Sequence, residues 1–125
     1  MLDHVGFQCT DLQASAAFYD AVLAPLGGTR LMDFTVAIGY GTDHADFWIG
    51  NADAAGEDLN NRESHIAFAA PDRAAVDAFF QAAVALGAEV LHEPRLHPEY
   101  HEHYYGAFVR DPDGNNVEAV CHRPA

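Results

Sequence analysis

The stretch HVGFQCTDLQASAAFYDA, residues 4–21, decides the fold, because it returns 61 positions later as HIAFAAPDRAAVDAFFQA, residues 65–82. Seven of the eighteen paired positions are identical. The identical pairs other than alanine are His4/His65, Phe7/Phe68, Asp11/Asp72 and Phe18/Phe79. Self-similarity at a fixed offset indicates that one supersecondary unit occurs twice in the chain.

Each copy begins with a short run of alternating apolar side chains and continues with apolar side chains at helical spacing. The sequence therefore predicts a strand followed by an amphipathic helix. In the first copy, Thr10 with Gln13 predicts a capping box at the start of the helix. In the second copy, Asp72 after Pro71 predicts the N-cap. We expect the first helix to end within residues 25–28 and the second at Gly87.

Three strand-like runs follow each helix. They cover residues 29–34, 35–40 and 46–50 in the first half, and 88–96, 104–110 and 116–121 in the second. The sequence thus predicts an α+β fold, a single domain over 1–125 built from two tandem βαβββ modules. Module one covers 1–50, a polar linker covers 51–63, and module two covers 64–125. Their curved mixed sheets would form an open cleft, which is a natural small-molecule site.

Composition excludes several classes of partner. The chain has six arginines, no lysine and 19 acidic residues, for a net charge of −13. Nucleic acids and anionic membrane surfaces would be repelled. No apolar run approaches the roughly 20 residues of a membrane span, and no leader-like segment is present, so we expect a cytoplasmic protein. The two cysteines, Cys9 and Cys121, are expected to be buried reduced thiols.

Three polar side chains in strand-like runs suggest a metal site. His4 and His65 occupy the same position in the two copies, and Glu118 lies in the middle of the last apolar run. A carboxylate in a core strand is costly unless it is paired or bound to a cation. Two imidazoles and one carboxylate would suit iron, manganese, zinc, nickel or cobalt, with coordination positions left open. The alternative is that both histidines are satisfied by hydrogen bonds and bind no metal.

The segment LHPEYHEHYYG, residues 96–106, is dense in histidine and tyrosine. If it borders the cleft, His103, Tyr104 and Tyr105 are candidates for orienting a substrate or moving a proton, as is His101. The alternative is a polar loop or strand edge without a catalytic role. The remaining histidines are expected at the surface: His44, His92, His97 and His122.

His4, His65 and the segment GAFVRDPDGNNVEAV, residues 106–120, which contains Glu118, resemble the vicinal oxygen chelate superfamily of glyoxalases, extradiol dioxygenases and bleomycin-resistance proteins. The resemblance spans nearly the whole chain. It implies paired βαβββ modules, a divalent metal that chelates substrate oxygens, and a homodimer. It also implies that His4, His65 and Glu118 are the metal ligands.

The sequence departs from parts of this superfamily. Glyoxalase I-like members place a carboxylate or amide where alignment of DFWIG on NVEAV puts Trp48, which argues against glyoxalase I activity. The lack of lysine argues against binding of a phosphonate such as fosfomycin, and extradiol dioxygenases favour tyrosine where this chain has Phe108. A metal-dependent lyase, isomerase or extradiol-type dioxygenase acting on a small oxygen-bearing substrate is expected. The alternative is a bleomycin-resistance-like protein that sequesters a small molecule without turnover.

Overall fold

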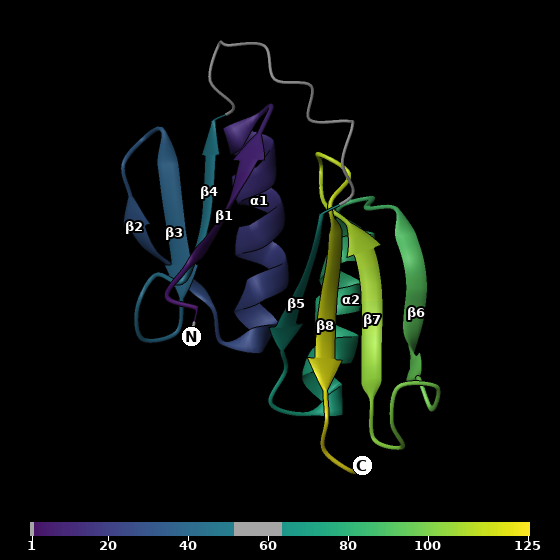
Figure 1. Ribbon diagram of the computed structural model, residues 1–125. Helices are drawn as coiled ribbons and strands as arrows, with labels where there is room; N and C mark the ends of the chain where they lie inside the picture. The colour runs from purple at the N-terminus through teal and green to yellow at the C-terminus, as the bar shows by residue number, and fades with distance from the viewer. Residues whose placement is uncertain (1, 52–63) are drawn as a thin grey trace.

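The computed structural model describes residues 2–51 and 64–125, and it contains two four-stranded mixed sheets, neither of them closed (Figure 1). The first module consists of β1 (Val5–Cys9), α1 (Leu12–Leu23), the 3₁₀ turn η1 (Ala24–Leu26), β2 (Thr29–Asp33), β3 (Ala37–Gly41) and β4 (Phe47–Asn51). The second consists of β5 (His65–Ala69), α2 (Arg73–Ala85), β6 (Val90–Leu96), β7 (Tyr105–Arg110) and β8 (Asn116–Cys121). The strand orders, β1-β4-β3-β2 and β5-β8-β7-β6, are the same in both modules.

This architecture confirms the predicted α+β fold of two βαβββ units. Within each module the first strand pairs in parallel with the last, and the other pairings are antiparallel. Of the predicted linker, Asn51 ends β4, and residues 52–63 lie outside the described part of the chain. Among the described residues, no helix has the length and apolar character needed to cross a bilayer.

Both helices are capped by the aspartates that the repeat places in register. Asp72 caps α2 as predicted, since its side chain accepts a hydrogen bond from the Ala75 backbone N–H. The capping box predicted at Thr10 is wrong, because Asp11 is the N-cap and accepts from the Ala14 N–H. An aspartate is as strong an N-cap as threonine, and its position here has the extended backbone that a cap requires.

The core lies between the sheets and the two helices, which also pack against each other. In Figure 1 both helices lie behind their sheets, so the uncovered faces of the two sheets point to the same side. Phe47 of β4 and Phe68 of β5 meet edge to face at 5.1 Å between ring centroids and join the two halves of the core. Cys9 and Cys121 are buried free thiols, as expected.

The DPDGNN turn of module two is bonded to module one. Asp111 in this turn is only 5 % exposed, and its carboxylate accepts hydrogen bonds from the Tyr19 hydroxyl at 2.7 Å and from both nitrogens of Asn115. Asp113 accepts from the backbone N–H and the hydroxyl of Thr10 at the start of α1. Burial and the Asp111 carboxylate raise the pKa of Tyr19, so its hydroxyl stays protonated and keeps this contact.

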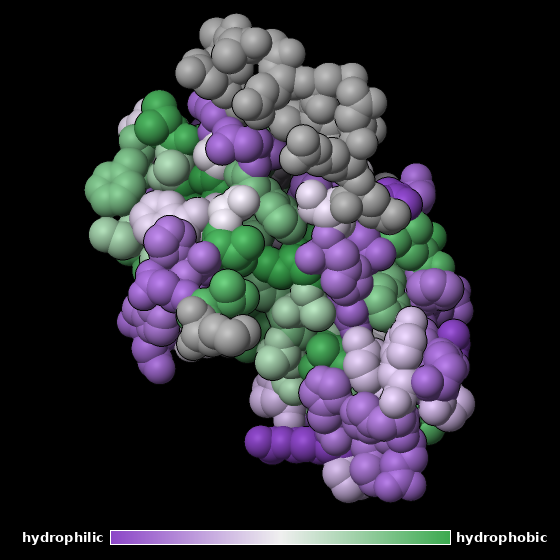
Figure 2. Space-filling model, in the orientation of Figure 1, coloured by the Kyte–Doolittle hydropathy of each residue, from purple (hydrophilic) through white to green (hydrophobic). Residues whose placement is uncertain are grey.

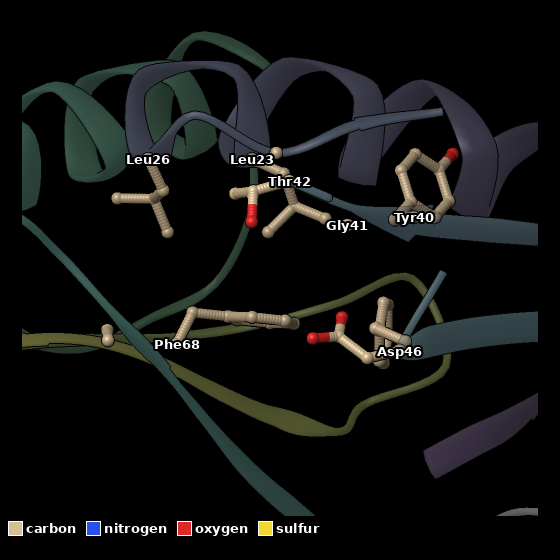
Figure 3. Close-up of a pocket in the computed structure, with 10 residues that line it drawn as sticks. Leu23, Leu26, Tyr40, Gly41, Thr42, Asp46 and Phe68 are labelled. Carbon is tan, nitrogen blue, oxygen red and sulfur yellow. The ribbon is translucent and has the colours of Figure 1, made fainter. Parts of the chain in front are cut away.

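The equivalent place on the other side of the pseudo-twofold axis is hollow. The strand registers make Thr42 the counterpart of Asp111, and the repeat makes Phe80 the counterpart of Tyr19, so the bond between Tyr19 and Asp111 has no equivalent pair at these two positions. A cavity of about 210 Å³ lies there, and Figure 3 shows Thr42, Asp46 and Phe68 around it. The described side-chain hydrogen bonds between the modules, from Thr10, Ser15 and Tyr19, go to Asp111 and Asp113 of the DPDGNN turn.

Replacing Tyr19 with Phe tests the contact between modules. The change leaves a buried carboxylate with one donor fewer, and we expect the free energy of unfolding to fall by about 2 kcal/mol. Urea unfolding followed by the fluorescence of the single tryptophan measures this loss. Tyr100→Phe is the matched control, because Tyr100 is largely exposed and its replacement should change stability by less than about 0.5 kcal/mol. Equal losses in both variants would contradict the assigned role of Asp111.

Candidate metal centre

The centre is built around Glu118 in the middle of β8. Strand alternation turns Val117 and Ala119 toward the core and Glu118 toward the uncovered face of the sheet. The strand register places Ala67 of β5 on one side of Glu118 and Phe108 of β7 on the other. Glu118 is nevertheless only 2 % exposed, so the surrounding side chains must satisfy its carboxylate.

Two side chains bond this carboxylate, one at each oxygen. The Nε2 of His65 lies 3.0 Å from Oε1, and the Tyr104 hydroxyl donates to Oε2. Burial, followed by the bond to Glu118, raises the pKa of Tyr104, which keeps the phenol protonated and able to donate. The His65 side chain is 46 % exposed, so its imidazole lies between solvent and the buried Glu118 carboxylate.

Gly106 of β7 leaves the space that this arrangement needs. A Cβ atom at this position would lie 3.3 Å from Glu118 Oε2 and from a ring carbon of Tyr104, and 3.4 Å from the Ala119 carbonyl oxygen. None of these atoms is at the end of a flexible exposed side chain. The absence of a side chain at Gly106 therefore allows Tyr104 to approach Glu118.

His97 anchors the segment that carries Tyr104. The prediction that His97 lies at the surface is wrong, because it is 2 % exposed and its ring contacts those of His92, Tyr100, Tyr104 and Phe108. Its backbone N–H donates to the Tyr104 carbonyl at 2.8 Å, and its Nδ1 lies 3.0 Å from Glu99. A histidine followed by proline in a polar segment resembles a loop residue, and only the packing of four rings reveals its burial. His44, His92 and His122 are exposed, as expected.

The structure brings together only some of the predicted site residues. His65, Glu118 and Tyr104 form one hydrogen-bonded group. His4 lies just before β1, is exposed, and bonds the adjacent Asp3 at 2.7 Å. Within residues 2–51 and 64–125, no three His, Cys, Asp or Glu side chains are close enough to hold a metal ion, so His4 does not join His65 and Glu118 there.

Two further candidates bond residues outside this group. Tyr105 faces α2, and its hydroxyl donates to Asp77 at 2.7 Å; burial and this bond raise the pKa of Tyr105 to about 12. His103 lies on the exposed segment before β7, and its Nε2 is 3.4 Å from Glu102. Strand alternation explains why Tyr105 faces α2 while Tyr104 faces Glu118, because adjacent residues turn to opposite sides of the sheet.

The uncovered face of module one differs in chemistry from that of module two. Trp48 pairs with Gly6 as Glu118 pairs with Ala67, so an indole occupies the position equivalent to the carboxylate. Its ring stacks on Phe34 at 6.0 Å and an interplanar angle of 2°. Figure 2 shows hydrophobic side chains gathered mainly over module one and hydrophilic ones over module two.

The family comparison agrees with this geometry. Residues 1–119 match the model of the Glyoxalase/Bleomycin resistance protein/Dioxygenase superfamily. The chain belongs to this superfamily. The structure is similar to that of a glyoxalase/bleomycin resistance protein from Albidiferax ferrireducens T118, at 30 % identity and a TM-score of 0.84, with 95 % of this chain and 97 % of the other covered. No curated protein sequence matches this chain.

More distant structures share the fold of the superfamily. A lactoylglutathione lyase from Agrobacterium tumefaciens matches at 24 % identity and a TM-score of 0.69, covering 97 % of this chain and 92 % of that one. The fosfomycin resistance protein FosX from Mesorhizobium loti matches at 18 % identity and a TM-score of 0.68, covering 97 % and 91 %. The fold of the superfamily is thus shared by proteins named for different activities.

Gly106→Ala tests whether the glycine maintains the approach of Tyr104 to Glu118. Because the added methyl group meets a buried carboxylate and a backbone carbonyl, we expect the free energy of unfolding to fall by about 1–3 kcal/mol. The measurement is urea unfolding. Gly6→Ala is the control, since a Cβ there meets Trp48 at an ordinary 3.6 Å and should cost less. A Gly106→Ala protein as stable as Gly6→Ala would show that Tyr104 and Glu118 are not tightly packed.

Proposed function

We propose that the protein is a metalloenzyme of the glyoxalase/dioxygenase type that acts on a small oxygen-bearing substrate. Its divalent metal, one of iron, manganese, zinc, nickel or cobalt, would be held by His65, Glu118 and His4. The observation that carries this proposal is the buried Glu118 carboxylate facing the imidazole of His65 at 3.0 Å. A carboxylate and an imidazole are ligands that these metals accept, and a bound cation would compensate the burial of the charge.

The third ligand is proposed to come from a second copy of the chain in a homodimer. His4 is exposed, and its described hydrogen bond goes to the neighbouring Asp3, so it is available to another subunit. Module one also exposes apolar side chains that association would cover. They are Leu31, Met32, Phe34 and Val36, between 41 % and 64 % exposed.

The bound metal would supply Lewis acidity toward a carbonyl or hydroxyl oxygen of the substrate. The protein's own side chains would position the substrate and exclude water. Tyr104 would hold Glu118 in one orientation through Oε2, which leaves Oε1 directed toward His65. His103, whose side chain is 40 % exposed on the segment before β7, would exchange a proton with the substrate, since imidazole is suited to proton transfer near neutral pH. Tyr105 is bonded to α2 and is assigned no part in this step.

The reaction proposed is that of a lyase, an isomerase or an extradiol-type dioxygenase. Glyoxalase I activity is not proposed, because Trp48 occupies the position equivalent to Glu118 and an indole neither ligates a metal nor accepts a proton from carbon. The buried free thiols of Cys9 and Cys121 suit the reducing cytoplasm that we propose as its compartment.

The alternative function is sequestration of a small molecule without turnover. The observation in its favour is that the described residues of one chain bring together two metal donors rather than three. In that case Glu118 would be satisfied by His65 and Tyr104 alone, and the uncovered faces would bind a ligand without a metal.

Metal analysis distinguishes these functions. Protein purified without chelator or nickel resin is expected to hold about one divalent ion per chain, and His65→Ala or Glu118→Ala should remove it because each deletes a ligand. His44→Ala is the control, since His44 is exposed on the turn between β3 and β4. Metal-free wild-type protein that still binds an aromatic ligand would favour sequestration.

Mixing two defective variants tests the dimer. His4→Ala and Glu118→Ala are each expected to bind no metal. If His4 completes the site of the partner, a heterodimer of the two variants contains one intact site and one site that lacks both ligands. Unfolding and refolding the mixture should therefore restore metal binding, measured by elemental analysis of the dimer fraction. No recovery would show that His4 does not act across a subunit interface.

A further inference from the structure

A hollow of about 420 Å³ lies beside His65 on the uncovered face of module two. Its lining comes from four strands and from the segment anchored by His97: His65, Leu91, His92, Tyr100, Phe108, Arg110 and Asn116. One wall is thus the imidazole that contacts Glu118. A molecule bound in the hollow would reach the candidate metal centre directly.

Four of the seven residues that line this hollow carry flat rings. Phe108 pairs with Glu118 in the sheet register and lies between two imidazoles. The ring centroid of His65 is 6.0 Å from that of Phe108, and the ring centroid of His92 is 5.3 Å from it. Such a surface favours a planar, conjugated molecule.

Three side chains that line the hollow are of types that donate hydrogen bonds to anions, although Glu118 bonds His65 and Glu89 bonds Arg110 from outside the lining. The chain has six arginines and eight histidines, and Arg110, His92 and His65 all line this one hollow. No aspartate or glutamate is among its described lining residues, although the chain has 19. The cavity between the modules, by contrast, includes Asp46. On a chain with a net charge of −13, the surface as a whole repels an anion.

Asn116 adds an unused hydrogen-bond acceptor. It pairs with His65 in the strand register, and its side-chain oxygen is buried without a donor from the part of the chain that the structure describes. A buried acceptor of this kind costs free energy unless a ligand or water donates to it. A hydroxyl or amide group of a ligand in the hollow could supply that hydrogen bond.

We propose that this hollow binds the carboxylate-bearing part of a planar oxygenated acid, such as a conjugated keto or hydroxy acid. The carboxylate would lie near His92 and Arg110, whose guanidinium is held in place by Glu89 and the Gly114 carbonyl. The remaining oxygens would lie toward His65. Only this last placement, beside the metal, depends on the proposed function.

The test compares benzoylformate with its uncharged primary amide by titration calorimetry, in EDTA so that no metal takes part. We expect the acid to bind about tenfold more tightly than the amide, because charge-assisted hydrogen bonds are stronger than neutral ones. Asn116→Asp adds a negative charge inside the hollow with almost no change in shape, and should abolish the preference. Asn51→Asp, at the exposed end of β4, adds the same charge elsewhere and should leave it unchanged.

His92→Gln is the second variant, and it should reduce the preference even if Asn116→Asp fails to fold. Its control is His44→Gln. Equal affinity for acid and amide, no binding of benzoylformate, or an undiminished preference in His92→Gln and in a folded Asn116→Asp protein would overturn the proposal. A protein that prefers the acid but binds no metal would refute the proposed metalloenzyme and leave this site intact. A protein that binds metal without preferring the acid would refute this binding site and leave the proposed metalloenzyme intact.

Discussion

The burial of the Glu118 carboxylate is the constraint on which the candidate site of this molecule depends. A charged group in a core strand is tolerated only when each oxygen has a partner, and here the partners are His65 and the Tyr104 hydroxyl. The need for the second partner explains features that otherwise lack a reason. Gly106 has no side chain because one would occupy the space of this contact, and the buried His97 fixes the segment from which Tyr104 reaches Glu118.

The two modules share a backbone plan but differ in chemistry at equivalent positions. Trp48 replaces Glu118 on the uncovered face, and the Phe80 ring replaces the Tyr19 phenol on the helix. Module one consequently has an aromatic, apolar face, whereas module two carries the carboxylate, the imidazoles and the polar hollow. The repeat supplies the symmetric scaffold, and these substitutions give one half polar side chains on its uncovered face and the other half an apolar surface.

Much of the fold could be predicted because its signals are local. The two βαβββ units follow from strand alternation, helical spacing and the offset of 61 residues. Strand alternation also predicts the side of the sheet that Glu118 faces. The helix cap was misassigned at Thr10 because two residues with similar capping ability are adjacent, and Thr10 instead bonds Asp113, which lies 103 positions away in sequence. Contacts of this range leave no periodic signal in the chain.

The site was harder to predict than the fold for the same reason. The contact of His65 with Glu118 is diagonal, because the register pairs His65 with Asn116 and Glu118 with Ala67. The choice between Tyr104 and Tyr105 depends on where β7 begins. A shift of one residue in the start of β7 would exchange the phenol that faces the carboxylate with the phenol that faces α2. The burial of His97 depends on four rings from two strands and a loop, none of them adjacent to it in sequence.

The two histidines that first suggested a metal are equivalent in sequence but not in how firmly the structure holds them. His65 is the first residue of β5, where it pairs with Asn116 and bonds Glu118. His4 precedes β1 by one residue, and the inter-strand contacts begin only at Val5, whose backbone N–H donates to Asp46. A metal ligand is effective only when its surroundings fix its orientation. The neighbour Asp3, itself exposed, cannot provide that rigidity for His4, so a group outside the described chain must do so if His4 is to ligate. This requirement is the physical basis for assigning His4 to the site of a second subunit.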